Sequence, residues 1–136
     1  MWQRKKKRPS PQKRIDSLIG AGTVVEGNVT FTGGLRIDGT VRGNVVAANG
    51  DPCTLVLSEH ARIDGEVRVT HMVINGTVNG PLLANDYVEL QPNARVVGDV
   101  TYRTLEMQVG AVVRGRLVHA EPGTASVVEL KRVATE

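Results

Sequence analysis

One short phrase recurs through this chain: an aliphatic residue, a polar residue, glycine, another polar residue and valine. It is clearest as Val25-Glu26-Gly27-Asn28-Val29, Ile37-Asp38-Gly39-Thr40-Val41 and Ile63-Asp64-Gly65-Glu66-Val67. A phrase that returns at a fixed period is typical of repeat architectures, in which small units stack on their neighbours. The repeat therefore constrains the fold more than any other feature of the chain.

The second or only glycine of each phrase marks the period. The markers are Gly27, Gly43, Gly65, Gly80, Gly98 and Gly115, and their spacings are 16, 22, 15, 18 and 17 residues. The long interval contains Asn49-Gly50-Asp51-Pro52, a turn by composition. Segments before the markers align too, with residues 55–63 matching 87–96 and residues 105–113 following the same outline. Six units of about 17 residues are predicted.

Apolar and polar residues alternate within each unit, which predicts strands with one buried face. No stretch from residue 15 to 120 sustains the apolar spacing of a helix. We expect an all-β fold, a right-handed parallel β-helix of about six coils over residues 16–120, with coils ~4.8 Å apart. A six-residue rhythm typical of left-handed forms holds only for Ile19, Val25, Phe31 and Ile37. A β-sandwich is the rival fold, but it does not require a repeated phrase.

Charge separates the termini from this core. Residues 1–14 hold seven of the seventeen Lys and Arg residues and no acid, so the remaining chain carries ten basic and fourteen acidic residues. We expect residues 1–15 and 121–136 to be disordered tails. Cys53 is the sole cysteine, which excludes an intramolecular disulfide framework and favours a reducing cytosol.

Neither metal nor nucleotide chemistry is indicated, and we predict a protein that is not an enzyme and has no cofactor. His60 and His71 fall at different points of the repeat, and we interpret them and His119 as exposed or turn residues. Cys53 is interpreted as a buried or turn thiol. The glycine phrases lack the Lys and Ser/Thr of a phosphate loop. The enzymatic alternative is an acyltransferase-like or metal-dependent trimeric β-helix.

The two ends of such a stack are its predicted functional surfaces. The first and last coils each have a row of unpaired backbone groups and an open apolar cross-section, which solenoids usually cover with a polar cap. No cap is evident here, although residues 127–130 could cover one end. We therefore predict self-assembly through the end coils, with a polymer interface at Ile19, Val24, Phe31, Leu105, Met107, Val109, Val112 and Leu117.

The N-terminal tail joins an aromatic side chain to five consecutive cations. Tryptophan favours the membrane–water interface, and a basic cluster is attracted to anionic lipids. We expect membrane binding through Met1, Trp2, Arg4, Lys5, Lys6, Lys7 and Arg8, at the cytoplasmic side of the cell membrane. Nucleic acid is the alternative ligand for these cations. The simplest interpretation is a charged tail that is solvated and binds neither.

The phrases Ile37-Asp38-Gly39-Thr40-Val41-Arg42-Gly43-Asn44-Val45 and Ala61-Arg62-Ile63-Asp64-Gly65-Glu66-Val67, between two tails, resemble the bactofilins over residues 16–120. These are polymer-forming bacterial cytoskeletal proteins. The resemblance implies a right-handed β-helix that joins end to end into filaments without nucleotide, with like ends meeting. It also implies attachment to the membrane through the N-terminal segment, and a scaffold role for cell-wall enzymes or polar proteins.

Overall fold

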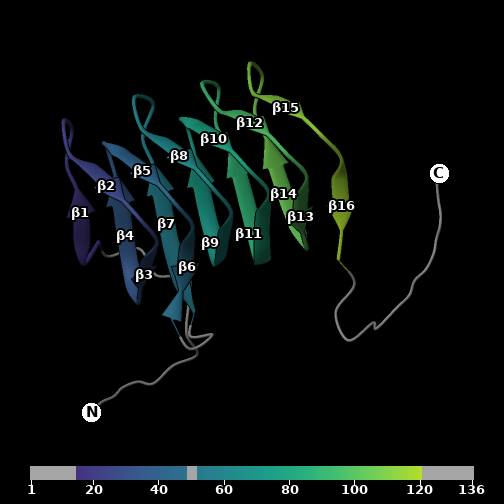
Figure 1. The fold of residues 1–136 in the computed structure, drawn as a ribbon. Helices are drawn as coiled ribbons and strands as arrows, with labels where there is room; N and C mark the ends of the chain where they lie inside the picture. The colour runs from purple at the N-terminus through teal and green to yellow at the C-terminus, as the bar shows by residue number, and fades with distance from the viewer. Residues whose placement is uncertain (1–14, 49–51, 121–136) are drawn as a thin grey trace, which may run out of the picture.

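The computed structural model describes residues 15–48 and 52–120, which form sixteen β-strands and no α-helix (Figure 1). The strands lie in three faces, and every pairing between them is parallel. Face A holds β1 (Ser17–Ile19), β4 (Gly33–Ile37), β7 (Cys53–Leu57), the C-terminal parts of β9 (Val67–Ile74) and β11 (Leu82–Leu90), and β14 (Thr104–Met107).

The other two faces complete each turn of the chain. Face B holds β2 (Val24–Glu26), β5 (Thr40–Arg42), β8 (Arg62–Asp64), β10 (Thr77–Asn79), β12 (Arg95–Val97) and β15 (Val112–Arg114). Face C holds β3 (Val29–Phe31), β6 (Val45–Ala47), the N-terminal parts of β9 and β11, β13 (Val100–Tyr102) and β16 (Leu117–His119). Faces A and C share one ten-stranded sheet because β9 and β11 run through the corner between them.

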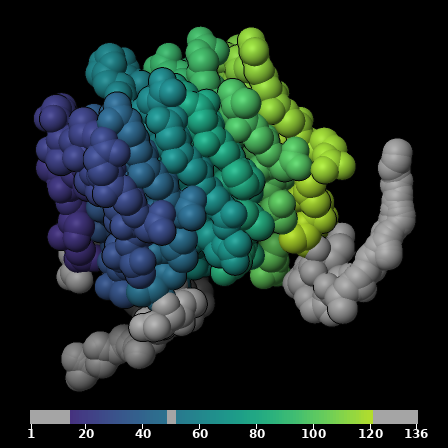
Figure 2. Space-filling model, viewed as in Figure 1, coloured from purple at the N-terminus to yellow at the C-terminus, as the bar shows by residue number. Residues whose placement is uncertain are grey.

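Each coil takes one strand from each face, so coil one is β1–β3 and coil six is β14–β16. Figure 2 shows the coils as successive layers, from purple coil one to yellow coil six. The predicted all-β solenoid of about six coils is confirmed. The right-handed winding stays a prediction. Both predicted tails lie outside the described residues, with the exception of Ile15. The predicted turn lies partly outside them too, because Asn49, Gly50 and Asp51 are not described.

The core is a set of aliphatic ladders that run through all coils. On face B the inward ladder is Val25, Val41, Ile63, Val78, Val96 and Val113, joined by the strand registers. Each of these residues lies two positions before a marker glycine, so the predicted repeat spacing is the true coil spacing. The four inner members are buried, whereas Val25 and Val113 in the end coils are only partly buried.

The marker glycines themselves form a column at the corner between faces B and C. A Cβ atom added to Gly65 would lie 2.2 Å from the carbonyl oxygen of Gly43, and one on Gly80 would lie 2.2 Å from that of Gly65. The same contact repeats from Gly98 to Gly80 and from Gly115 to Gly98. Glycine recurs at this corner because successive coils approach too closely there for any side chain.

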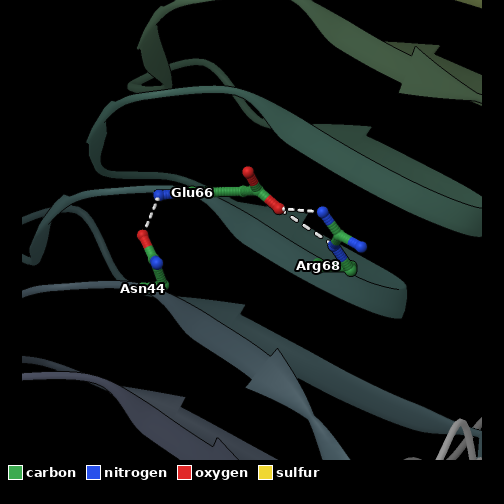
Figure 3. A network of polar contacts seen from close by, with 3 residues as sticks. All are labelled: Asn44, Glu66 and Arg68. Carbon is green, nitrogen blue, oxygen red and sulfur yellow. Dashed lines mark hydrogen bonds and ion pairs between the residues drawn. The ribbon is translucent and has the colours of Figure 1, made fainter.

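The polar residue after each marker glycine ties one coil to the next. Asn28 Oδ1 accepts a hydrogen bond from the Asn44 backbone N–H at 2.8 Å, and Asn44 Oδ1 accepts one from the Glu66 N–H at 2.9 Å (Figure 3). In the next coil this position is Pro81, which has no N–H to donate. The Glu66 carboxylate instead pairs sideways with Arg68 Nε at 2.9 Å.

One sequence alignment needs correction. Leu55 pairs in register with Met72, and Met72 pairs with Val88, so Leu55 corresponds to Val88 rather than to Tyr87. Ile63 likewise corresponds to Val96, so residues 55–63 match residues 88–96.

Candidate assembly surfaces

The C-terminal end of the solenoid presents an uncovered apolar cross-section. Met107 pairs with Leu90, and Leu117 pairs with Val100, and both inner partners are fully buried. The two end residues are 43% and 46% exposed, because no further coil covers them among the described residues. The strands β14, β15 and β16 each pair on one side only. This end therefore combines apolar side chains with free strand edges, the features that favour docking.

The N-terminal end has the same character. Ile19, Val25 and Val29 occupy the inward positions of coil one, and all three are only partly buried against the core. Leu18, which points outward on face A, is 60% exposed. The strands β1 and β2 end their sheets, and β3 pairs only with β6.

The predicted interface residues fall into distinct groups in the structure. Ile19, Leu105, Met107 and Leu117 lie at inward positions of the end coils. Val24 and Val112 lie in the outward column of face B, Val109 lies at an exposed turn, and Phe31 is buried. The structure thus brings together three of the eight, Leu105, Met107 and Leu117, at the C-terminal end.

Sequence reasoning missed three residues that belong to these end surfaces: Val25, Val29 and Val113. They occupy the end positions of ladders whose inner members are buried. The repeat phrase contained the signal, because each lies at the same place in the phrase as a buried residue of an inner coil.

The glycine column limits what can stack on the C-terminal end. The marker spacing of 15 to 22 residues would place the next glycine between residues 130 and 137, but residues 130–136 contain none. A side chain at that corner would meet the Gly115 carbonyl as closely as the inner contacts imply. A further coil with the same winding would therefore need a glycine at this corner.

The histidines and the cysteine are dispersed. His60 is exposed in a turn, as expected, and His119 is exposed on β16. For His71 the expectation is wrong: it lies on β9, its side chain is only 13% exposed, and its Nε2 is 3.1 Å from Asp86 Oδ2. It is covered because β9 continues through a corner where other coils turn. Cys53 is buried at the start of β7.

Metal binding has no support in the part of the chain that the structure describes. No group of three His, Cys, Asp or Glu side chains there could hold a metal ion. The residues predicted to bind the membrane all lie in residues 1–8, outside the described part of the chain. None of the described segments forms a helix that could cross a lipid bilayer.

The shifted pKa values on the outer faces have causes in the packing and hydrogen bonding of the solenoid itself. A hydrogen bond from Asn79 Nδ2, helped by Arg62, lowers the pKa of Asp64. A hydrogen bond from the Arg116 backbone, helped by its side chain, lowers the pKa of Asp99. Burial raises the pKa of Tyr87 well above its usual range. The two aspartate shifts follow chiefly from hydrogen bonds between neighbouring coils, and the tyrosine shift follows chiefly from burial.

Comparison with known proteins agrees with this architecture. The family described as "Bactofilin: Polymer-forming cytoskeletal" matches residues 17–118, which is nearly the whole solenoid. The chain belongs to the bactofilin family. This confirms the resemblance and makes the protein a member of a family of polymer-forming cytoskeletal proteins.

Two curated bactofilins are similar to this chain. Bactofilin BacO of Myxococcus xanthus (strain DK1622) is 28% identical over 102 residues, which cover 75% of this chain and 78% of BacO. Bactofilin BacP of the same organism is 28% identical over 117 residues, 84% of this chain but 47% of BacP. The match thus spans about half the length of BacP. No solved structure matches the chain.

Proposed function

We propose that this bactofilin is a nucleotide-independent scaffold protein that joins end to end through coils one and six. The observation that carries the proposal is the pair of uncovered ends, where residues such as Leu117 are exposed although their register partners are fully buried. Burying apolar surface is worth ~25 cal/mol per Å², so covering these ends favours association.

Contact between like ends gives two isologous interfaces, one between copies of coil one and one between copies of coil six. Alternation of the two interfaces produces an open filament without polarity. No nucleotide is needed because the driving force is burial and strand-edge pairing, and the glycines of the repeat serve close coil packing.

A charge placed in the last coil tests end docking. In Leu117→Glu, the carboxylate must enter the buried interface, so we expect folded protein that sediments as a monomer. Val97→Glu is the matched control, because Val97 is exposed to a similar extent (50%) but lies on the side of coil five. Analytical ultracentrifugation at about 1 M salt, where electrostatic contacts between the sides of the solenoid are screened, and circular dichroism measure both variants. Polymers of Leu117→Glu as large as those of Val97→Glu would exclude docking through coil six.

We further propose that residues 1–8 attach the filament to the cytoplasmic face of an anionic membrane. The support is the sequence: Trp2 followed by Arg4, Lys5, Lys6, Lys7 and Arg8. Each such cation gains about 1 kcal/mol near an anionic leaflet, and polymerisation multiplies weak attachments. A filament held there would position other proteins, including cell-wall enzymes or polar proteins, without catalysing a reaction.

Liposome flotation distinguishes membrane binding from nucleic-acid binding. Protein with residues 1–8 should float with vesicles that contain anionic lipid, and protein without them should remain in solution. Mixed-sequence DNA is assayed in parallel, because phosphates attract the same cations. Binding to DNA but not to vesicles would overturn the membrane proposal and leave end-to-end assembly unaffected.

A further inference from the structure

Face B carries a groove that begins at β10 of coil four, lies mainly over the last two coils, and combines cations with apolar side chains. Thr77, Arg95, Val96, Val97, Val112 and Arg114 line it. The register places Arg95 beside Val112 and Val97 beside Arg114, so charge and apolar surface alternate across β12 and β15. Both valines are exposed, Val97 by 50% and Val112 by 37%.

The two arginines of this groove differ from the others on face B. Arg42 pairs with Glu26 at 2.6 Å, and Arg62 pairs with Asp64 at 3.0 Å. Among the described residues, no carboxylate lies within ion-pair distance of Arg95 or Arg114, and both are exposed. The groove therefore has two guanidinium groups available to an anionic partner, beside two valines that gain from being covered.

Face A carries the complementary charge over the same two coils. Glu89 and Glu106 are register partners on β11 and β14. Glu106 Oε1 accepts a hydrogen bond from the Tyr87 hydroxyl at 2.8 Å, and Glu89 Oε2 accepts bonds from Gln91 and Gln108 at 3.0 Å each. These neutral groups orient the two carboxylates and leave their charges uncompensated by any cation among the described residues.

We propose that the groove on face B binds face A of a second copy of this chain, so that filaments associate sideways. The two surfaces are opposite in charge and lie at the same position along the solenoid axis. Arg95 and Glu89 both belong to coil five, and Arg114 and Glu106 both belong to coil six. The contact joins two different faces, so it is heterologous and can repeat from one rod to the next. It extends the proposed end-to-end filament and uses a different surface.

The contact is exposed at its rim and electrostatic in origin, so salt should weaken it. The screening length falls from ~30 Å at about 0.01 M salt to ~3 Å at about 1 M. Bundles at low salt should therefore separate into single filaments at high salt, while the apolar end contacts persist.

Charge reversal in coil five tests the proposal without substituting a residue of the last coil, although Glu89→Arg also removes the hydrogen bond that Gln108 of that coil donates. Arg95→Glu and Glu89→Arg should each reduce bundling at low salt by about tenfold, because like charges then face each other. The double variant Glu89→Arg/Arg95→Glu should restore it, because each face again meets its opposite charge. Arg103→Glu, at an exposed link between β13 and β14, changes net charge by the same amount as Arg95→Glu and should bundle like the wild type.

Two measurements separate lateral from end contacts. Low-speed pelleting and filament width in electron micrographs report bundling, and the polymer fraction at high speed reports end docking. Equal loss of bundling in Arg103→Glu, or no recovery in the double variant, would overturn the face A to face B contact. If Leu117→Glu abolishes polymers but leaves low-salt association of the monomers intact, lateral pairing stands independently of end docking.

Discussion

At the scale of single residues, the fold depends on positions where no side chain fits. The glycine column holds successive coils in backbone contact at one corner, with less than 3 Å between a hypothetical Cβ and the carbonyl of the preceding coil. Loss of a hydrogen bond at one corner would be local, but a misplaced Cβ forces two coils apart and disturbs the ladders on either side.

Replacing one of these glycines should therefore be costly. Gly80→Ala places a methyl group 2.2 Å from the Gly65 carbonyl oxygen, and we expect a loss of roughly 3 kcal/mol in the free energy of unfolding. Gly20→Ala is the control, since nothing lies within 4 Å of its added Cβ. Thermal and denaturant unfolding measure both variants. Similar stability in the two variants would mean that the coils are not held this closely.

A second residue-scale prediction concerns acid. The folded-state pKa of Asp64 is lowered, chiefly by the hydrogen bond from Asn79, relative to about 3.9 for an unfolded chain. This carboxylate thus stabilises the fold above about pH 4, and its contribution is lost as pH falls through the lowered folded-state value. Asp64→Asn should be less stable than wild type at pH 7 and should lose less stability on acidification. An unchanged pH dependence of unfolding would contradict the role given to Asp64.

At the scale of the element, the strands of the inner coils could be predicted well and the ends only in part. The position two residues before each marker glycine always faces the core, so Val41, Ile63, Val78 and Val96 follow from the phrase alone. Strand alternation also places Val24, next to the inward Val25, on the outer side of face B. The phrase does not indicate that Phe31 is buried although it belongs to an end coil.

The corners explain the remaining errors. His71 and Tyr87 lie where β9 and β11 continue from one face to the next, and the local phrase contains no sign that a strand will bend rather than end. The pairing of these two long strands across the corner depends on contacts with neighbouring coils. Single-sequence periodicity does not describe such contacts.

Matched substitutions in one ladder test the distinction between inner and end coils. Val78→Ala in β10 removes fully buried atoms and should cost about 2 kcal/mol, whereas Val113→Ala in β15 should cost less than about 1 kcal/mol in a dispersed monomer. The Leu117→Glu background supplies that monomer, since assembly adds to apparent stability. Equal costs at the two positions would show that coil six is covered as fully as coil four.

At the scale of the whole molecule, the solenoid has three charged sides and two uncovered ends. The ends are apolar, and the sides carry ion pairs within and between strands together with the arginines of the face B groove, Arg95 and Arg114. Our proposals assign growth of a filament to the ends and salt-sensitive association to the sides. The family match over residues 17–118 covers the same solenoid that these surfaces belong to.

Electron microscopy of the purified full-length protein, without nucleotide and at high salt, tests the central claim most directly. End-to-end docking predicts single unbundled filaments in wild type and in Val97→Glu, and dispersed particles in Leu117→Glu. Discrete particles of wild type at every protein concentration and salt would contradict assembly through the uncovered ends.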